Sequence, residues 1–589
     1  MLLRYLSIIG AVLAAPLLSF GQSAVTEFNN SLVRARIMGG GRIGSHPTAG
    51  TIGYFIPSGD TTSPLYSSGL WFGGTTLDGQ QRAFGHLYGD PAFFSTGPLT
   101  VDGSAELAAG TAEDYDRFWT VTRAQVENHI AYYDCLSDPE CDIDVAFPGG
   151  YSTPNAIVQW PAMGDVQAGQ AIYLAPFIDR DADGVYDPNV GDHPCMPGDL
   201  AIYHIFNDQG SAQPTGGAMG LEVHMTIFGY WGYNGIDVGR TLFTHYRIIN
   251  RSSAAYTNFR IGAFADFDLG CYSDDRIATD VERNLLYIYN ASDNDANCAS
   301  PGYGEQPPAF GVQVLKGPLM DPDGTDNTDT PLIPAFNGTG FNDGAIDNER
   351  HGLSATMYYN GTGVPGSGDP TNLAQYDNYL RGLWANGVPL TYGDNGYGGV
   401  TNAAFAFPGT SDPNGVGTGG VPQAPWTDGT ANDRKGIASM GPITLEPGAE
   451  QEILVAYIYA RATTGGAQES VAALKLASDE VAAFAMITPG LMDGSLPCMS
   501  LGTGIDGLFT RTTEPRIYPN PTQDILNIRV PKFSDRTAIS ILDDKGSIVM
   551  QGSLTGPSTT FDVRALTPGV YTIRMIANSN ASVGRFVKH

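Results

Sequence analysis

“DLAIYHIFND” (Asp199–Asp208) is the first of three runs that decide the fold. “LEVHMTIFGYW” (Leu221–Trp231) and “TLFTHYRIINR” (Thr241–Arg251) follow it at intervals of roughly twenty residues. All three are rich in β-branched and aromatic residues, and turn-forming Gly, Asn, Asp or Pro separate them. Successive strands of this kind predict a mainly β chain, built from several antiparallel β-sandwich domains with long loops.

The composition agrees with turn-rich β structure. The chain of 589 residues contains 75 Gly and 39 Pro, and only 16% of its residues are charged. One clear helical pattern interrupts the β runs at 468–487, where apolar residues recur near one face and stop before Pro489. We expect one packing helix there.

The net charge of −30 limits the partners of the protein. Binding to nucleic acid or to an anionic membrane surface requires clustered Lys and Arg, so neither is expected as a partner. An acidic surface suits divalent cations better.

The N-terminus has the features of a secretory signal peptide. Arg4 precedes an apolar run from Leu6 to Leu18, and small residues follow, which predicts a signal peptide over 1–21. The apolar run is shorter than the roughly 20 residues that span a bilayer, and no later segment is longer. We therefore expect an exported chain with no transmembrane segment in its mature form.

A change in charge divides the chain near residue 511. From Arg511 to His589 there are ten Lys and Arg but only six Asp and Glu, whereas the preceding chain is strongly acidic. We predict a β-rich N-terminal domain with an acidic loop at 22–215, a second β-rich domain at 216–500, a linker at 501–515 and a separate C-terminal domain at 516–589.

Four blocks in the tail carry a resemblance to a known family: “YPNPTQDILNI”, “ISILDDKGSIV”, “FDVRALTPGVYTIRM” and “GRFVKH”. In their order and spacing they resemble the type A C-terminal sorting domain of type IX secretion system substrates. The resemblance implies a small Ig-like β-sandwich, contact with the secretion machinery, passage through the outer membrane, removal of the tail, and release or attachment at the cell surface. The sorting-motif residues are Tyr518, Pro519, Asn520, Pro521, Gly569 and Tyr571.

The body resembles a group of large uncharacterised cargo proteins that bear the same tail. The shared phrases include “GLWFGG”, “IVQWPAMGD”, “LAPFIDRDADGVYDP” and “RKGIASMGPITLEPG”. This resemblance implies no particular activity.

The six cysteines favour disulfides over zinc, because the chain is exported and no pair has Cys-x-x-Cys spacing. The nearest pairs would join Cys135 to Cys141 and Cys271 to Cys298, which leaves Cys195 and Cys498. The sequence alone does not establish this connectivity.

The loop “FIDRDADGVYDPNVGDHP” has a calcium-binding pattern. Carboxylates stand at positions one, three, five and nine, with Gly184 at the bend, as in oxygen-rich calcium loops. Position twelve is Val190 rather than Glu, so the loop is not an EF-hand. We predict one calcium ion, with a solvated turn as the alternative. The predicted ligands are Asp179, Asp181, Asp183, the Val185 backbone oxygen, Asp187 and Asp192.

A second acidic group lies in “DFDLGCYSDD”. Asp266 and Asp268 have strand spacing and therefore share a face, and Asp274 and Asp275 follow closely. We consider these four residues a possible second metal site, and solvated loop carboxylates the alternative.

No catalytic motif is present, and we identify no catalytic residue. His204, His224 and His245 lie on successive predicted strands, but strand alternation places the first two on opposite faces, which argues against shared zinc. We therefore expect a non-enzymatic, calcium-stabilised protein of the cell surface or exterior, structural, adhesive or carbohydrate-binding, with polysaccharide or another surface component as partner. The alternative is an extracellular hydrolase of polysaccharide or protein without a recognisable motif.

Overall fold

The structure is a computed structural model of the whole chain. It divides into two compact units, a body at 1–501 and a tail at 502–589, each of which is described by itself. The described residues are 24–46, 50–87, 93–210, 216–231, 237–328, 338–360, 363–488, 490–492, 516–518, 522–529, 538–542, 548–556, 558–577 and 580–588. The predicted signal peptide and the predicted linker lie outside them.

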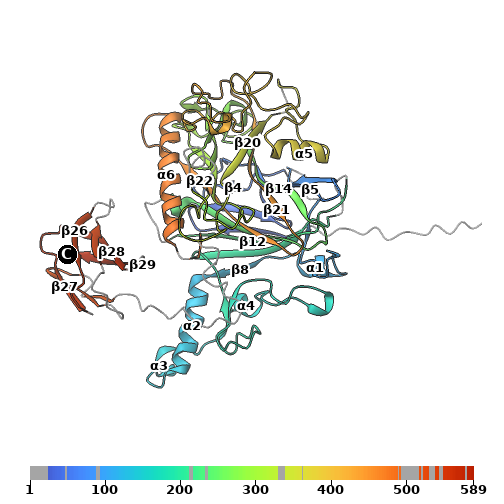
Figure 1. The fold of residues 1–589 in the computed structure, drawn as a ribbon. Coiled ribbons are helices and arrows are strands. Elements are labelled where there is room, and N and C mark those ends of the chain that lie inside the picture. The colour runs from blue at the N-terminus through green and yellow to red at the C-terminus, as the bar shows by residue number, and fades with distance from the viewer. Residues whose placement is uncertain are drawn as a thin grey trace, which may run out of the picture. The chain divides into compact units, whose positions relative to one another are not determined.

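Two nine-stranded antiparallel sheets form the body (Figure 1). The first sheet has the order β1 (Val25–Asn29), β2 (Arg34–Met38), β3 (Arg42–Gly44), β5 (Ser67–Thr76), β14 (Tyr256–Phe267), β21 (Arg434–Leu445) and β20 (Leu353–Tyr359), with β4 (Tyr54–Phe55) paired to β2 and β6 (Gln81–Gly85) to β5.

The second sheet contains the three runs that first indicated the fold, as neighbouring strands β11, β12 and β13. Its order is β15 (Asp275–Asp280), β16 (Leu285–Asn290), β19 (Ala309–Lys316), β22 (Glu450–Ala460), β13 (Leu242–Asn250), β12 (Leu221–Gly229), β11 (Leu200–Asn207) and β7 (Ser95–Thr96), with β8 (Trp119–Thr122) paired to β11. The mainly β, antiparallel fold class predicted from the sequence is confirmed.

A single hydrophobic core joins the two sheets. The ring of Phe310 on β19 lies 5.4 Å from Tyr54 and 6.3 Å from Phe267, both on the first sheet. The Tyr457 hydroxyl on β22 forms a 2.8 Å hydrogen bond with the Ser68 hydroxyl on β5. The inward faces of the two sheets are therefore interlocked by aromatic packing, as in a sandwich.

The predicted boundary at 215/216 is wrong. Strands β1 to β6 pair into a sheet with β14, β20 and β21, and β7 and β8 pair with β11 of the other sheet. Both sheets thus contain strands from each side of residue 215, and the body forms one unit. These long-range pairings are not visible in the sequence, because the pattern of a strand is the same whichever strand it pairs with.

Helices cover the outer faces of the sandwich. Helix α6 (Ala467–Ile487) is the predicted packing helix, and it lies against the second sheet (Figure 1). Its buried residues include Val471, Leu474 and Val481. Helix α5 (Leu373–Leu380) lies on the first sheet, where the Tyr376 ring is 4.7 Å from the ring of Trp71. None of the described helices is both long and apolar enough to cross a membrane.

An insertion between β8 and β11 packs on the outer face of β11. It contains α2 (Arg123–Ser137), α3 (Ile143–Ala146), α4 (Asn155–Val158) and the short strands β9 (Phe177–Ile178) and β10 (His193–Pro194). Its small core includes Trp160 and Phe177, together with Tyr203 of β11. The remaining short elements of the body are α1 (Thr111–Asp114), η1 (Val166–Ala168), η2 (Asp237–Arg240), η3 (Tyr272–Asp274), η4 (Val416–Thr418), β17 (Asn294–Asp295) and β18 (Gly304–Glu305).

The tail is a small unit of two antiparallel sheets with its own core. One sheet has the order β23 (Arg516–Tyr518), β24 (Ile525–Arg529) and β27 (Ser558–Asp562); the other has β26 (Ile548–Ser553), β25 (Ala538–Leu542), β28 (Gly569–Ala577) and β29 (Asn580–Lys588). Tyr571, Ile573 and Met575 are buried, as their alternation along β28 predicts.

The shared sheets predict one cooperative unfolding transition for the body. Because strands from both sides of residue 215 complete each sheet, neither half buries its own core. We expect calorimetry of the full chain to show a single transition for residues 24–492, and a Phe310→Ala variant, which removes packing from both sheets, to lower that transition as a whole. Two separate body transitions, only one of them sensitive to Phe310→Ala, would contradict the single core.

Candidate functional site

The acidic loop of the insertion connects two paired strands. Ile178 at the end of β9 pairs with His193 at the start of β10, so Asp179 and Asp192 face each other across the base of the loop. Gly184 has φ +81°, which allows the sharp bend expected at this position.

Three of the predicted ligands converge. Carboxylate oxygens of Asp179, Asp181 and Asp192 all lie within 4.8 Å of one another. Asp192 is fully buried and accepts hydrogen bonds of 2.8 Å from the backbone N–H groups of Arg180 and Asp187. Backbone groups from two parts of the loop therefore hold the Asp192 carboxylate in place at the base of the loop.

The other predicted ligands point elsewhere in this geometry. Asp183 accepts a 2.8 Å hydrogen bond from the Val185 N–H, and Asp187 accepts one of 2.8 Å from the Asn189 N–H. Neither carboxylate belongs to the converging group, and the Val185 side chain is exposed. The sequence pattern thus identified more carboxylates than the loop brings together.

The converging carboxylates repel one another. Burial, and then the charges of Asp179 and Asp181, raise the pKa of Asp192. Desolvation and the neighbouring charge of Asp183 raise the pKa of Asp181. A cation bound between them would relieve this repulsion.

A disulfide-closed helix supports the loop. Arg180 donates to Asp134 on α2 over 2.9 Å, and the next residue, Cys135, is bonded to Cys141 with a Cα–Cα distance of 5.2 Å. Cys195, which directly follows β10, is also in a disulfide, and its expected partner, Cys498, lies outside the described residues. The loop therefore projects from a covalently braced base.

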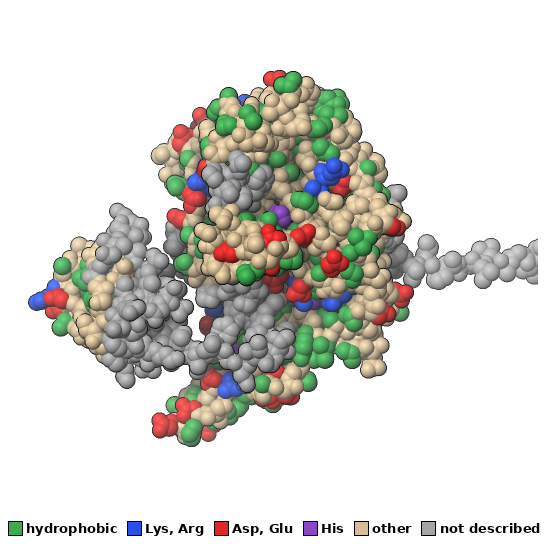
Figure 2. Space-filling view, in the orientation of Figure 1, with side chains coloured by type: hydrophobic (Ala, Val, Ile, Leu, Met, Phe, Trp, Pro, Cys, Tyr) green, Lys and Arg blue, Asp and Glu red, His purple; other side chains and the backbone are tan. Residues whose placement is uncertain are grey.

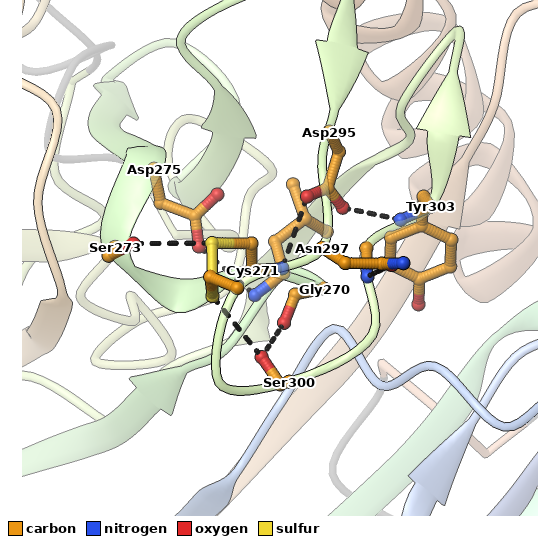
Figure 3. The surroundings of a disulfide bond; sticks show 11 residues. Gly270, Cys271, Ser273, Asp275, Asp295, Asn297, Ser300 and Tyr303 are labelled. Atoms are coloured by element: carbon orange, nitrogen blue, oxygen red, sulfur yellow. Dashed lines mark hydrogen bonds between the residues drawn. A yellow bond between two sulfur atoms is a disulfide. The ribbon is translucent and has the colours of Figure 1, made fainter.

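A further acidic group lies beside the Cys271–Cys298 disulfide. Cys271 is bonded to Cys298, with a Cα–Cα distance of 5.5 Å, and lies near Asp274 and Asp295. The Asp295 carboxylate accepts hydrogen bonds from the backbone N–H groups of Cys271 (3.1 Å) and Tyr303 (2.6 Å), as Figure 3 shows. Because Cys271 has no free thiolate and Asp295 is hydrogen-bonded, this group braces the loop and is a poor metal site.

Only two of the four residues predicted for a second metal site lie close together. Asp266 at the end of β14 and Asp268 just after it do converge, but with Asp433, which directly precedes β21. Asp275 is instead buried, and its carboxylate accepts a 3.0 Å hydrogen bond from the Leu269 N–H. Asp274 lies near Cys271 of the Cys271–Cys298 disulfide. The pairing of β14 with β21, which the sequence did not reveal, is what brings Asp433 to Asp266.

The three histidines form no shared site. His204 is buried in the sandwich core, where its Nε2 accepts from the Gly40 N–H over 3.1 Å. His224 is buried on the opposite face of the second sheet and bonds to Glu222 and to the Tyr203 hydroxyl. His245 lies beside Glu452, at 3.7 Å. The insertion covers the face of the second sheet that carries His224, which is why His224 is buried.

Large aromatic side chains fill the core of the body. Trp71 and Trp384 are fully buried, and Trp71 stacks on Phe264 with ring centroids 5.5 Å apart. Trp231 is partly exposed at 39%, but the residues that follow it are outside the described part of the chain.

Acidic side chains are spread over the face of the body seen in Figure 2, and basic ones are sparse there.

Comparison with known proteins identifies the tail. The family model described as “Secretion system C-terminal sorting domain” matches residues 516–589. No curated protein matches the chain. Among solved structures, a polysaccharide lyase aligns over 62% of this chain and 34% of its own, with 6% identity and a TM-score of 0.17. The chain therefore spans about a third of that lyase, and a TM-score of this size does not show a shared fold.

The buried pair of Glu222 with Arg251 predicts a specific pH dependence. Burial alone would raise the pKa of Glu222, but hydrogen bonds from His224 and Arg251 and their charges lower it to about 2. The folded-state pKa is below the usual 4.5, so this stabilisation is present above pH 4.5 and is lost as the pH falls toward 2. We expect Glu222→Gln to remove about 3 kcal/mol of it at neutral pH.

Urea unfolding at several pH values provides the measurement. The difference in unfolding free energy between wild type and Glu222→Gln should shrink between pH 5 and pH 2, whereas the exposed Glu106→Gln should match wild type throughout. A difference that stays constant with pH would show that Glu222 carries no paired charge.

Proposed function

Because this chain is a cargo of the type IX secretion system, exported to the cell surface or the extracellular space, we propose that its body is a calcium-stabilised structural or adhesive protein of the cell exterior. The observation that carries the proposal is the convergence of Asp179, Asp181 and Asp192 in the braced loop. Calcium prefers several carboxylate and carbonyl oxygens at 2.3–2.6 Å, which a loop of this composition supplies.

The secreted destination supports this role. Disulfides form outside the cytoplasm, and the two described disulfides flank the acidic loop and the end of β14. In the proposed state, calcium would neutralise the loop after export, so that Asp183, Asp187 and the Val185 carbonyl turn toward the ion as additional ligands. The partner surface would be a polysaccharide or another surface component.

An extracellular hydrolase remains the second candidate, and one observation favours it. Asp266 and Asp268 line a cavity, and burial and the charge of Asp433 raise the pKa of Asp268 to about 7, a value suited to a general acid. Incubation of the full chain with polysaccharides and denatured proteins tests it: turnover abolished by Asp268→Asn would favour the hydrolase, and binding without turnover would favour the structural role.

Removal of calcium should destabilise the body. At a calcium concentration about 100 times the Kd, one site adds about 2.7 kcal/mol of stability. We expect calcium to raise the Tm of the EDTA-treated full chain by a few degrees. In Asp181→Asn or Asp192→Asn, calcium should raise the Tm by less, because the contribution of the loop site is lost.

Asp144→Asn is the matched control, because Asp144 is an exposed aspartate on α3 of the same insertion and outside the converging group. Its calcium response should equal that of wild type. If both loop variants also respond like wild type, the loop does not bind calcium.

Deletion of residues 516–589 should stop export without unfolding the body. The described residues of the tail form their own hydrophobic core, and those of the body form a separate one. We expect the truncated protein to remain inside the outer membrane, with a body Tm like that of the full chain, as shown by cell fractionation and calorimetry. Truncated protein appearing at the surface would show that the body carries its own export signal.

A further inference from the structure

A cavity at one edge of the first sheet is formed where three neighbouring strands begin or end. Tyr66 directly precedes β5, Asp268 directly follows β14 and Asp433 directly precedes β21. Because the three strands are antiparallel neighbours, these ends lie at the same edge. In register, Asp266 lies opposite Lys435 on one side and Ser67 on the other.

The cavity has a volume of about 210 Å³ and a strongly acidic lining. Its lining residues are Tyr66, Asp266, Asp268, Tyr272, Asp433 and Lys435. Carboxylate oxygens of the three aspartates lie within 4.8 Å of one another. Two oxygens on opposite sides of a calcium ion are separated by about twice the 2.3–2.6 Å bond, so this spacing suits a single ion.

The carboxylates lack the partners that buried charges require. The Asp266 side chain is only 4% exposed, and its carboxylate makes no hydrogen bond with any described residue; the one cation that acts on it is Lys435, its neighbour in the sheet register. One oxygen of Asp433 is buried and has no hydrogen-bond partner among the described residues. Lys435 also forms an ion pair outside this group, since its Nζ lies 3.7 Å from the carboxylate of Asp369. One lysine therefore faces several aspartates, and buried carboxylates left in this state are strongly unfavourable.

Burial and the neighbouring negative charges raise the pKa of Asp266 well above its usual value. The chain fixes these side chains in place despite their repulsion. Asp266 is held in the sheet by pairing on both sides, and the Cys271–Cys298 disulfide anchors the segment after Asp268. An ordered sheet edge that keeps repelling carboxylates together points to a positively charged ligand.

We propose that Asp266, Asp268 and Asp433 bind a calcium ion in this cavity, separate from the ion of the acidic loop. Three carboxylates supply part of the six to eight oxygens that calcium takes. A water molecule occupies about 30 Å³ in the liquid, so the cavity has room for the ion and for waters that complete its coordination. Water molecules would fill the coordination positions that the three carboxylates leave open. Hydroxyl groups of a polysaccharide can replace these waters.

This site bears on the choice between a structural protein and a hydrolase. A bound cation holds Asp266 and Asp268 ionised, which removes them as general acids. The cavity then serves binding rather than proton transfer.

Isothermal titration of the EDTA-treated full chain with calcium tests the proposal. We expect two ions per wild-type chain if both sites bind. In an Asp181→Asn background, which removes the loop site, one ion should remain, and adding Asp266→Asn or Asp433→Asn should weaken its Kd at least about tenfold. Because Asp266→Asn is tested in this background, failure of the loop site and failure of the cavity site give different results.

A melting experiment separates loss of binding from loss of folding. Without calcium, Asp266→Asn should melt no lower than wild type, since it removes a buried unpaired charge; with calcium, it should gain less than wild type. Asp144→Asn should match wild type in both. If Asp266→Asn and Asp433→Asn both titrate like their background, or if magnesium binds and calcium does not, the calcium assignment is wrong.

Discussion

The face-to-face packing of the two large sheets is the constraint on which the rest of the body depends. Phe310 lies between Tyr54 and Phe267, and Phe267 is the last residue of β14. The side chain of Phe267 points into the core, so Asp266 and Asp268 on either side of it point to the opposite face. The core contact thereby fixes the orientation of the carboxylates that line the cavity.

The same packing explains why the acidic loop can be rigid. Tyr203 lies on β11 of the second sheet and contributes to the small core of the insertion, together with Trp160 and Phe177. Phe177 belongs to β9, and β9 leads directly into Asp179. A continuous path of packed side chains therefore runs from the sandwich to the first carboxylate of the loop, and the Cys135–Cys141 disulfide braces the neighbouring helix.

Local patterns predicted the parts of the structure that depend on local sequence. Alternation along β28, the helical period at 468–487 and the short spacing of Cys135 and Cys141 each describe neighbours in the chain, and the structure contains the corresponding elements. The DxDxDG spacing likewise placed Asp179 and Asp181 together. The sorting tail was recognisable because four blocks occur in a fixed order over a short segment.

Features that depend on distant pairing were not predictable in the same way. The division at residue 215 failed because β5 and β14, far apart in sequence, are neighbours in one sheet. Asp433 was missed because only the β14–β21 register places it beside Asp266. Asp274 and Asp275 were included in the predicted second metal site because they are close to Asp268 in the sequence. The chain turns after Asp268, so these two residues lie apart from the group that Asp266, Asp268 and Asp433 form.

The central claim, that calcium stiffens this exported body, is tested most directly by counting metal in the mature protein. Protein collected from the cell exterior, exchanged into metal-free buffer without chelator, is analysed by inductively coupled plasma mass spectrometry. The account predicts calcium in stoichiometric amount, with one ion lost in Asp181→Asn and another in Asp266→Asn. Protein that is folded and at the cell exterior but contains no calcium, and takes up none when it is added, would contradict it.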